Sequence, residues 1–403
     1  MFEIIIYILL ILSLIYGFYF LIMASGVFRK KKCEIDNNKK NHFAILIAAR
    51  NEETVIKNLI NSLKKQNYPS NKYDVYVIVN NCTDNTLEVA KNAGAKIIEC
   101  KQKVKSKGEV LKYTFNKLKS NDEIDAYVIF DADNVVHREF LNKMNDSINC
   151  GYEVVQGFRD TKNICDNWLS TSYAILYYIQ SLFINKSRFN FGMSSFLNGT
   201  GFMVKKETID RYGYDPKTIT EDIEYTAICA INGIKIAFNE NAITYDEQVT
   251  DFKSSLKQRK RWSFGAIQCL KNYTGSLIKE GIKNKRFECF DVIIFYFGII
   301  FHVLFTIVSL IGIFYNVFYL NNFNSMDVVI YFIMFLINYF IGVVFRMIVI
   351  KKCNKSIKEN IWGILLFDLF VLSWFPINFI CLFIKNCNWD HIKHDRNVDT
   401  LNI

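Results

Sequence analysis

Two aspartates in the middle of the chain have the spacing of a divalent metal site. Asp131 and Asp133 follow an apolar stretch and stand two residues apart, so both carboxylates can reach one hard cation. Mg²⁺ or Mn²⁺ at this point would bridge the carboxylates to a diphosphate. A solvated turn is the alternative, but the position directly after an apolar strand favours the metal site.

A second acidic motif, Thr220-Glu221-Asp222, opens a helix-like stretch. Asp222 is a candidate general base, which would take a proton from an attacking hydroxyl. A threonine followed by acids is also a common helix start, so a purely structural role is the alternative for this motif.

A third motif, Q-x-x-R-W, precedes the apolar C-terminal third of the chain and consists of Gln258, Arg261 and Trp262. Arg261 can stabilise a leaving diphosphate, and Trp262 can offer a flat face to a sugar ring. The alternative is a basic stretch that touches anionic lipid beside a membrane.

The elements that must position these motifs alternate between strand-like and helix-like stretches over residues 42–250. The predicted strands are 43–48, 75–79, 96–99 and 126–130, and the predicted helices are 52–65, 87–93, 110–119 and 223–231. This alternation predicts an α/β fold with a mainly parallel sheet and helices on both faces. Because polar clusters follow three of the strands directly, we expect them to form one site at the carboxyl edge of the sheet.

Composition and missing motifs exclude several classes of protein. Of the 403 residues, 51% are apolar or aromatic, which excludes a disordered or disulfide-stapled chain. There is no G-x-G-x-x-G after the first strand and no G-x-x-x-x-G-K-[ST], which argues against dinucleotide and P-loop chemistry. The net charge of +10, next to long apolar runs, favours an anionic membrane face and an anionic small substrate over nucleic acid.

Long apolar runs near both ends predict a multi-pass protein of the cell membrane. Residues 4–23 form a run of 20 uncharged residues, long enough to cross a bilayer as a helix. The basic Arg29-Lys30-Lys31-Lys32 behind it places the middle of the chain in the cytoplasm. Three further runs cover 292–319, 328–350 and 361–384, and the stretch 254–284 before them is amphipathic, as expected for a helix along the inner membrane face.

The last of these runs leaves two alternatives open. If 361–384 crosses the membrane, the basic tail with Lys393 and Arg396 lies outside, against the positive-inside rule. The run also contains Asp368, Pro376 and Asn378, which favours a re-entrant or interfacial helix pair covered by protein. An ordinary crossing with an external tail is the alternative.

Seven motifs in order resemble the family 2 glycosyltransferases, in the membrane-integrated branch that includes cellulose, chitin, hyaluronan and poly-N-acetylglucosamine synthases. The motifs are Ala48-Ala49-Arg50-Asn51-Glu52, Asn81-Cys82-Thr83-Asp84-Asn85-Thr86, Lys107-Gly108, Asp131-Ala132-Asp133, Asn198-Gly199-Thr200-Gly201, Thr220-Glu221-Asp222 and Q-x-x-R-W. The resemblance covers roughly residues 42–265.

The resemblance implies a GT-A fold, a nucleotide-sugar donor, usually UDP-linked, and inversion at the anomeric carbon with Mg²⁺ or Mn²⁺. It assigns roles to the following residues: donor binding to Asn51, Glu52, Asn80, Asp84, Lys107, Asp131, Gln258, Arg261 and Trp262; metal binding to Asp131 and Asp133; catalysis to Glu221, Asp222 and Arg261; and acceptor contact to Gly199, Thr200, Gly201 and Trp262. One departure is Asn80, which stands where the family usually has an acid and so leaves the nucleobase preference open.

We therefore expect a membrane glycosyltransferase that extends a β-linked cell-surface polysaccharide. Transfer of one sugar to a lipid acceptor is the first alternative, and an inactive scaffold that only binds nucleotide sugar is the second. The expected organisation is a transmembrane anchor at 1–30, a cytoplasmic GT-A domain at 40–250, an interfacial segment at 251–290, membrane helices at 291–385 and a basic tail at 386–403. The expected partners are the donor, the acceptor and membrane lipid; accessory subunits cannot be named from the sequence.

Overall fold

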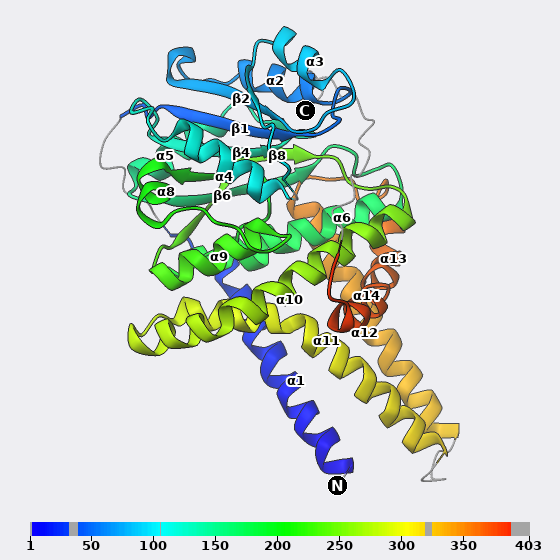
Figure 1. Ribbon diagram of the computed structural model, residues 1–403. Coiled ribbons are helices and arrows are strands. Elements are labelled where there is room, and N and C mark those ends of the chain that lie inside the picture. The colour runs from blue at the N-terminus through cyan, green and yellow to red at the C-terminus, as the bar shows by residue number, and fades with distance from the viewer. Residues whose placement is uncertain (1, 32–38, 105, 319–324, 388–403) are drawn as a thin grey trace.

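A computed structural model describes residues 2–31, 39–104, 106–318 and 325–387, and Figure 1 shows a sheet domain resting on a group of helices. The strands are β1 (Phe43–Ala49), β2 (Tyr73–Val79), β3 (Lys96–Glu99), β4 (Ala126–Asp131), β5 (Val135–Val136), β6 (Val154–Thr161), β7 (Phe202–Lys205) and β8 (Ile236–Asp246). The predicted strands correspond to β1, β2, β3 and β4, with ends that differ by at most two residues.

The eight strands form one sheet in the order β3-β2-β1-β4-β7-β6-β8-β5. The strands β3, β2, β1 and β4 are parallel, β7 is antiparallel to β4 and β6, and β8 pairs parallel with β6 and antiparallel with β5. The chain reaches β2 and β3 on one side of β1 and then returns to β4 on the other side. Such a switch opens a crevice at the carboxyl ends of the strands, where ligands bind in α/β sheets.

Helices cover both faces of the sheet. They are α2 (Ile56–Lys64), α3 (Thr86–Asn92), α4 (Lys107–Leu118), α5 (Phe140–Asn149), α8 (Lys206–Tyr212) and α9 (Glu221–Asn232). Alternate residues of β1 point to opposite sides: Phe43 and Ile45 join a core under α2, α3 and α5, whereas Ala44 and Leu46 join a core under α4 and α9. Because β1 is buried on both faces, it is apolar along its whole length.

The helical half combines the N-terminal helix, helices from the middle of the chain and the C-terminal third. Its elements are α1 (Phe2–Ser25), α6 (Trp168–Ile179), a π-helical turn (Gln180–Lys186), α7 (Ser187–Asn190), α10 (Phe252–Lys283), α11 (Phe287–Phe318), α12 (Ser325–Lys352), α13 (Ile361–Leu372) and α14 (Trp374–Phe383). Asp251 caps the first turn of α10 by accepting from the Ser254 amide. The predicted amphipathic stretch 254–284 is α10.

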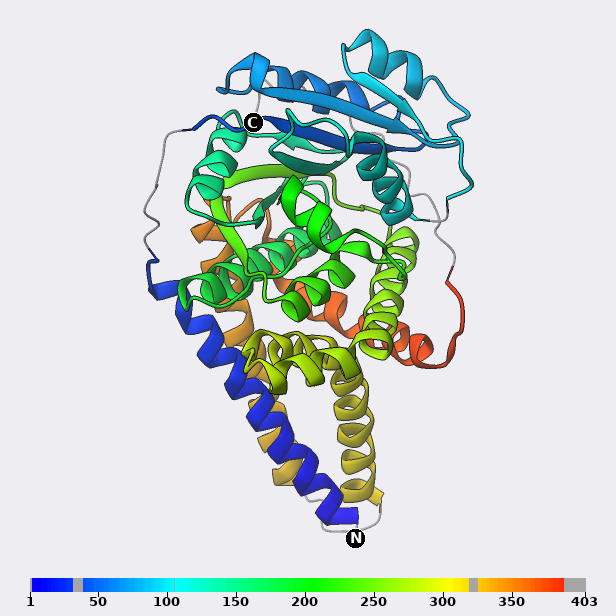
Figure 2. The same cartoon turned by 60° about the vertical axis from the view of Figure 1, so that its left-hand side comes forward.

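Within the described residues, four stretches are long and apolar enough to cross a membrane: Tyr7–Phe28, Phe287–Gly312, Val328–Lys352 and Ile361–Phe383. In Figures 1 and 2, α1, α11 and α12 project away from the sheet domain, whereas α13 and α14 lie across the junction. The last stretch is divided at Ser373 into two helices, α13 and α14, which fits the expected helix pair, and it is also long and apolar enough for the alternative of an ordinary crossing. The loop at 319–324 and the tail from residue 388, with Lys393 and Arg396, lie outside the described residues.

Two close contacts hold the helical half together and join it to the sheet domain. The buried Arg188 of α7 donates from Nε and Nη2 to the Asp291 carboxylate of α11, at 2.8 and 3.0 Å. Gly265 of α10 lies so near Thr220 that a Cβ at this glycine would be 2.1 Å from the Thr220 hydroxyl oxygen. Helix α10 can therefore approach the start of α9 only because residue 265 has no side chain.

Candidate active site

A cavity of about 440 Å³ lies at the carboxyl ends of β1, β2 and β4, between the sheet and helices α6, α9 and α10. The predicted site residues in its lining are Glu52, Asn80, Lys107, Asp131, Asp133, Gly199, Glu221, Asp222, Gln258, Arg261 and Trp262. These residues are spread over more than two hundred positions of the sequence, and the fold brings them to one concave surface.

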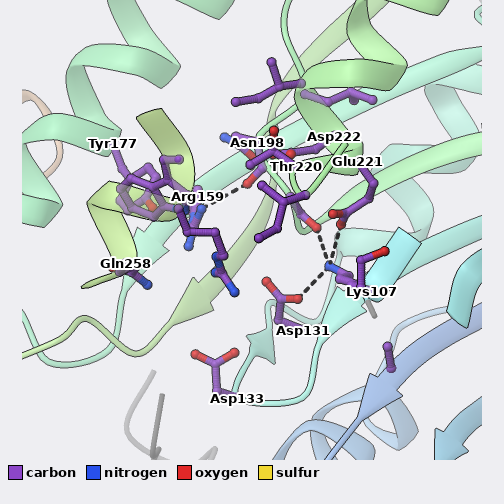
Figure 3. A pocket seen from close by; sticks show the side chains of 18 of the residues that line it. Lys107, Asp131, Asp133, Arg159, Tyr177, Asn198, Thr220, Glu221, Asp222 and Gln258 are labelled. Carbon is purple, nitrogen blue, oxygen red and sulfur yellow. Dashed lines mark hydrogen bonds and ion pairs between the residues drawn. The ribbon is translucent and has the colours of Figure 1, made fainter. Parts of the chain in front are cut away.

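Lys107 stands at the centre of the polar part of the cavity (Figure 3). Its ammonium group lies 2.6 Å from Asp131 Oδ1, 2.6 Å from the Gly199 carbonyl oxygen and 3.8 Å from Glu221 Oε1. Burial opposes the charge of Lys107, but the Asp131 and Glu221 carboxylates raise its pKa. The lysine therefore stays a cation and holds the end of β4 next to the start of α9.

The turn after β4 fixes the positions of the two aspartates. The Asp131 amide donates to Asn134 Oδ1 and to the Thr200 hydroxyl, both at 3.0 Å. Asp133 is 7% exposed, lines the cavity and accepts from the Glu247 amide at 3.2 Å through Oδ2. Figure 3 shows both carboxylates on the same side of the cavity.

Of the two acids at the start of α9, Glu221 is buried and Asp222 is partly exposed in the cavity wall. Burial raises the pKa of Asp222 above the usual range, against the opposing effects of the Ile223 amide and the Lys107 cation. Burial also raises the pKa of Glu221, and the nearby Lys107 counteracts this shift. A raised pKa suits a general base, because a carboxylate with a very low pKa is too weak a base to take a proton from a hydroxyl group. Asp222 also adjoins Gly199: a Cβ at this glycine would be 3.4 Å from Asp222 Oδ2.

Arg159, at the end of β6, is a cavity residue that the sequence analysis did not identify. Its Nε donates to Asp246 Oδ2 at 2.6 Å, and its Nη1 donates to the Asn198 carbonyl oxygen at 3.0 Å. The guanidinium carbon lies 3.8 Å from the centroid of the Tyr177 ring. The available signal was the position of Arg159 directly after Phe158, near the end of the stretch 154–161 that forms β6.

Several buried polar atoms in the lining have no hydrogen-bond partner within the described part of the chain. They are both amide atoms of Asn198, the Thr220 hydroxyl and Gln258 Oε1. Buried polar groups are rarely left unpaired in native proteins, and an unpaired group at a cavity wall is typical of a ligand site. The sequence analysis quoted Asn198 within a motif but gave it no role.

Arg261 and Trp262 reach the cavity from α10. No hydrogen bond or ion pair joins the Arg261 guanidinium to another described residue, so it is a cation available to a ligand. The Trp262 ring makes edge contacts with Tyr173 and Tyr177, with ring centroids 6.0 and 6.2 Å apart. These neighbours hold the indole in place.

Four predicted residues lie outside the cavity lining. Asn51 Oδ1 accepts from the Thr83 amide at 2.8 Å, and Asp84 accepts from the amides of Glu53 and Thr86. Thr200 and Gly201 are the other two, and the Thr200 hydroxyl accepts a hydrogen bond from the Asp131 amide. All four belong to segments next to residues of the cavity lining.

Asn80 lies in the cavity lining, and its side-chain amide is hydrogen-bonded to backbone carbonyl groups. Its amide nitrogen donates to the carbonyl oxygens of Cys100 and Gln102, at 3.1 and 3.4 Å. An acid could not make these contacts, because it has no donor when ionised. The asparagine therefore fixes the loop after β3, which forms one side of the cavity.

Comparison with known proteins assigns the fold and the family. A model of the group described as "Glycosyltransferase like family 2" matches residues 40–265, more than half of the chain. This chain belongs to that family. The prediction of a glycosyltransferase is thereby confirmed at the level of the family.

Similar proteins of this family come from several organisms. The chain is 24% identical over 283 residues to a probable glycosyltransferase, YdaM, of Bacillus subtilis, covering 64% of each protein. It is 23% identical over 233 residues to the beta-monoglucosyldiacylglycerol synthase of Synechocystis sp., covering 57% of this chain and 48% of that protein. The match thus spans between about half and two thirds of the length of these relatives.

A solved structure confirms the fold class. The mannosyltransferase PcManGT from Pyrobaculum calidifontis, in complex with GDP-Man and Mn²⁺, superimposes with a TM-score of 0.52 at 15% identity. The superposition covers 67% of this chain and 75% of that protein. The prediction of a GT-A fold with a mixed, mainly parallel sheet is confirmed.

Proposed function

We propose that the protein is a membrane-associated inverting glycosyltransferase that transfers a sugar from a nucleotide-sugar donor, UDP-linked, to an acceptor hydroxyl. One observation carries the proposal: Asp133, Asp222 and Arg261, from three distant parts of the chain, line the same cavity. A metal-binding acid, a base and a free cation are the groups that such a displacement requires on its two sides.

The acids of the β4 turn suit a hard divalent cation, Mg²⁺ or Mn²⁺. Asp131 and Asp133 offer carboxylate oxygens within the cavity, and Mg²⁺ is commonly held by one or two carboxylates together with substrate phosphates and water. When bound, the cation would neutralise charge on the diphosphate leaving group. The solved structure of the mannosyltransferase supports this reading, since it contains a nucleotide sugar and Mn²⁺.

The chain's own residues perform the remaining steps. Asp222 accepts the proton of the acceptor hydroxyl as its oxygen attacks the anomeric carbon. Arg261 and Lys107 stabilise the negative charge that develops on the diphosphate at the opposite side. The unpaired amide of Asn198 can hold a sugar hydroxyl between the two groups. Burial keeps water out, which strengthens each of these interactions.

The arrangement relative to the membrane is part of the proposal. We place α1, α11 and α12 across the bilayer, with the sheet domain on the cytoplasmic side, next to Arg29-Lys30-Lys31. We place α10 and the pair α13–α14 along the inner membrane face, because these helices lie across the junction in Figures 1 and 2. Growth of a β-linked polysaccharide, expected from the synthase-like branch, is supported by Q-x-x-R-W; a lipid acceptor is supported by the relative from Synechocystis.

The test is release of UDP by the purified full chain with Mg²⁺ or Mn²⁺ and a panel of UDP-sugars. We expect Asp222→Asn, which removes the base but keeps the shape, to lower turnover by about 10²- to 10⁴-fold while donor binding remains. Asp122→Asn, in an exposed turn, is the matched control and should leave turnover unchanged. A wild-type protein that binds the donor but never turns it over, in membranes as in detergent, would favour the inactive scaffold.

A further inference from the structure

The cavity has an apolar part that the transfer chemistry does not use. The aliphatic and aromatic side chains of this part are Leu176, Tyr177, Ile179, Ile184, Leu197, Ile219, Ile223, Phe295 and Trp374. Donor phosphates and a sugar ring gain little from such a wall. An apolar cavity wall next to a small number of polar groups is typical of a site for an amphiphilic ligand.

The apolar part is built largely from the helices on the membrane side of the molecule. Phe295 belongs to α11 and lies inside the candidate membrane span Phe287–Gly312. Trp374 begins α14, in the apolar stretch that lies across the junction. The cavity thus extends from the candidate catalytic acids to side chains of two candidate membrane stretches.

Part of the apolar wall comes from α6, the π-helical turn and α11. Leu176, Ile184 and Phe295 line the cavity and are each partly exposed. Ile184 lies in the π-helical turn Gln180–Lys186. π-helical turns are rare and are frequently found at functional sites, because the extra residue redirects side chains.

We propose that the acceptor is a membrane lipid with a free hydroxyl, whose alkyl tail lies along Leu176, Ile184 and Phe295. The inference rests on the proposed function and names its acceptor class. The lipid hydroxyl oxygen forms the new bond to the anomeric carbon, while the bond between that carbon and the diphosphate oxygen breaks. The electron pair leaves with the nucleoside diphosphate, and the hydroxyl proton passes to Asp222.

A polysaccharide acceptor fits this wall less well. A sugar chain presents hydroxyl groups along its whole length, and each one placed against an aliphatic surface would lose hydrogen bonds to water. For an alkyl tail, by contrast, the binding free energy becomes more favourable with every methylene that leaves water. Because a candidate membrane helix, α11, forms part of this wall, a lipid can reach the wall while its tail stays in the bilayer. A soluble polymer does not need such a route.

The direct test is a series of acceptors that differ only in tail length. With the full chain, the divalent cation and the UDP-sugar that supports UDP release, we would measure transfer to 1-butylglycerol, 1-hexylglycerol and 1-octylglycerol below their aggregation concentrations. We expect kcat/KM to rise by up to about fourfold per methylene, since burial of each methylene contributes about 0.8 kcal/mol. Product analysis should show one sugar per acceptor.

A variant series sharpens the test. Ile184→Gln should flatten the dependence of kcat/KM on tail length, because the tail would then pass a polar amide. Ile282→Gln is the matched control: this isoleucine is on the outer side of α10, 67% exposed, and lies outside the cavity, so the dependence on tail length should stay as in the wild type.

The outcomes separate the two proposals. UDP release with equal use of all three alkylglycerols, or elongation of a soluble oligosaccharide in their place, would overturn the lipid acceptor and leave the glycosyltransferase intact. No UDP release with any donor would overturn both. The tail-length series is measured on the wild-type protein, so it tests the lipid acceptor even if Ile184→Gln fails to fold.

Discussion

Arg259 and Arg261 stand two positions apart on α10 and occupy opposite environments. Arg259 is fully buried: its Nη1 donates to the Phe370 carbonyl oxygen at 3.0 Å and to the Ser373 hydroxyl at 2.8 Å, where α13 ends and α14 begins. Its guanidinium carbon lies 4.5 Å from the centroid of the Phe370 ring. Arg261, by contrast, lines the cavity.

The difference shows that one turn of α10 has two tasks. On one side of the helix Arg261 supplies a cation to the candidate active site; on the other side Arg259 joins the helix to the junction between α13 and α14. Two residues correspond to about 200° around a helix, so these two arginines face different partners. Basic residues in the same stretch are therefore not interchangeable, and the two kinds of role can be separated by measurement.

The largest effect is expected for Arg261→Ala. Loss of a cation that acts on the developing charge should lower kcat by about 10²- to 10³-fold, with little change in the temperature of unfolding. Lys257→Ala, which removes an exposed cation of the same helix, is the control and should retain activity. Equal losses in the two variants would mean that α10 contributes only general positive charge, and the distinction between the arginines would fail.

A smaller effect, on stability instead of turnover, is expected for Arg259→Ala. The substitution removes the donor of the Phe370 carbonyl and the packing under two rings, so we expect the free energy of unfolding in detergent to fall by about 3 kcal/mol. Arg259→Met keeps most of the volume and should lose less. Thermal unfolding checks both. An unchanged unfolding temperature combined with lost turnover would assign Arg259 to the ligand.

The smallest effect concerns the pH dependence of kcat/KM. Asp222 must be ionised to act as a base, and burial raises its pKa while Lys107 opposes this rise. Activity is therefore lost as the pH falls through a pKa above that of an ordinary aspartate. Lys107→Gln should move this acidic limb to higher pH, whereas Arg261→Ala should leave it in place. A limb unmoved by Lys107→Gln would show that another group titrates.

The parallel part of the sheet could be predicted from the sequence, because its signals are local. Apolar stretches alternate with amphipathic ones, and the polar motifs follow the strands directly, so Asp131 and Asp133 could be placed at a strand end before any coordinates were known. Helix α9 was predicted in the same way from Thr220-Glu221-Asp222, although the Thr220 side chain does not cap the helix.

The rest depends on contacts between distant parts of the chain. The strand β5 has two residues, too few for a periodic signal. The role of Arg159 follows from its pairing with Asp246, 87 positions away. The choice between a re-entrant or interfacial helix pair and an ordinary crossing could not be made from residues 361–384 alone, because α13 and α14 pack against α6 and α10, which are distant in the sequence.

The close approach of Gly265 to Thr220 has a consequence for truncation. A fragment that ended at residue 250 would contain every acid of the cavity, but it would lack Arg261 and would expose to water the side of α9 that packs on α10 and α11. A water-soluble version of this enzyme must therefore retain α10, with glycine at 265, and replace outward-facing residues such as Ile278 and Ile282.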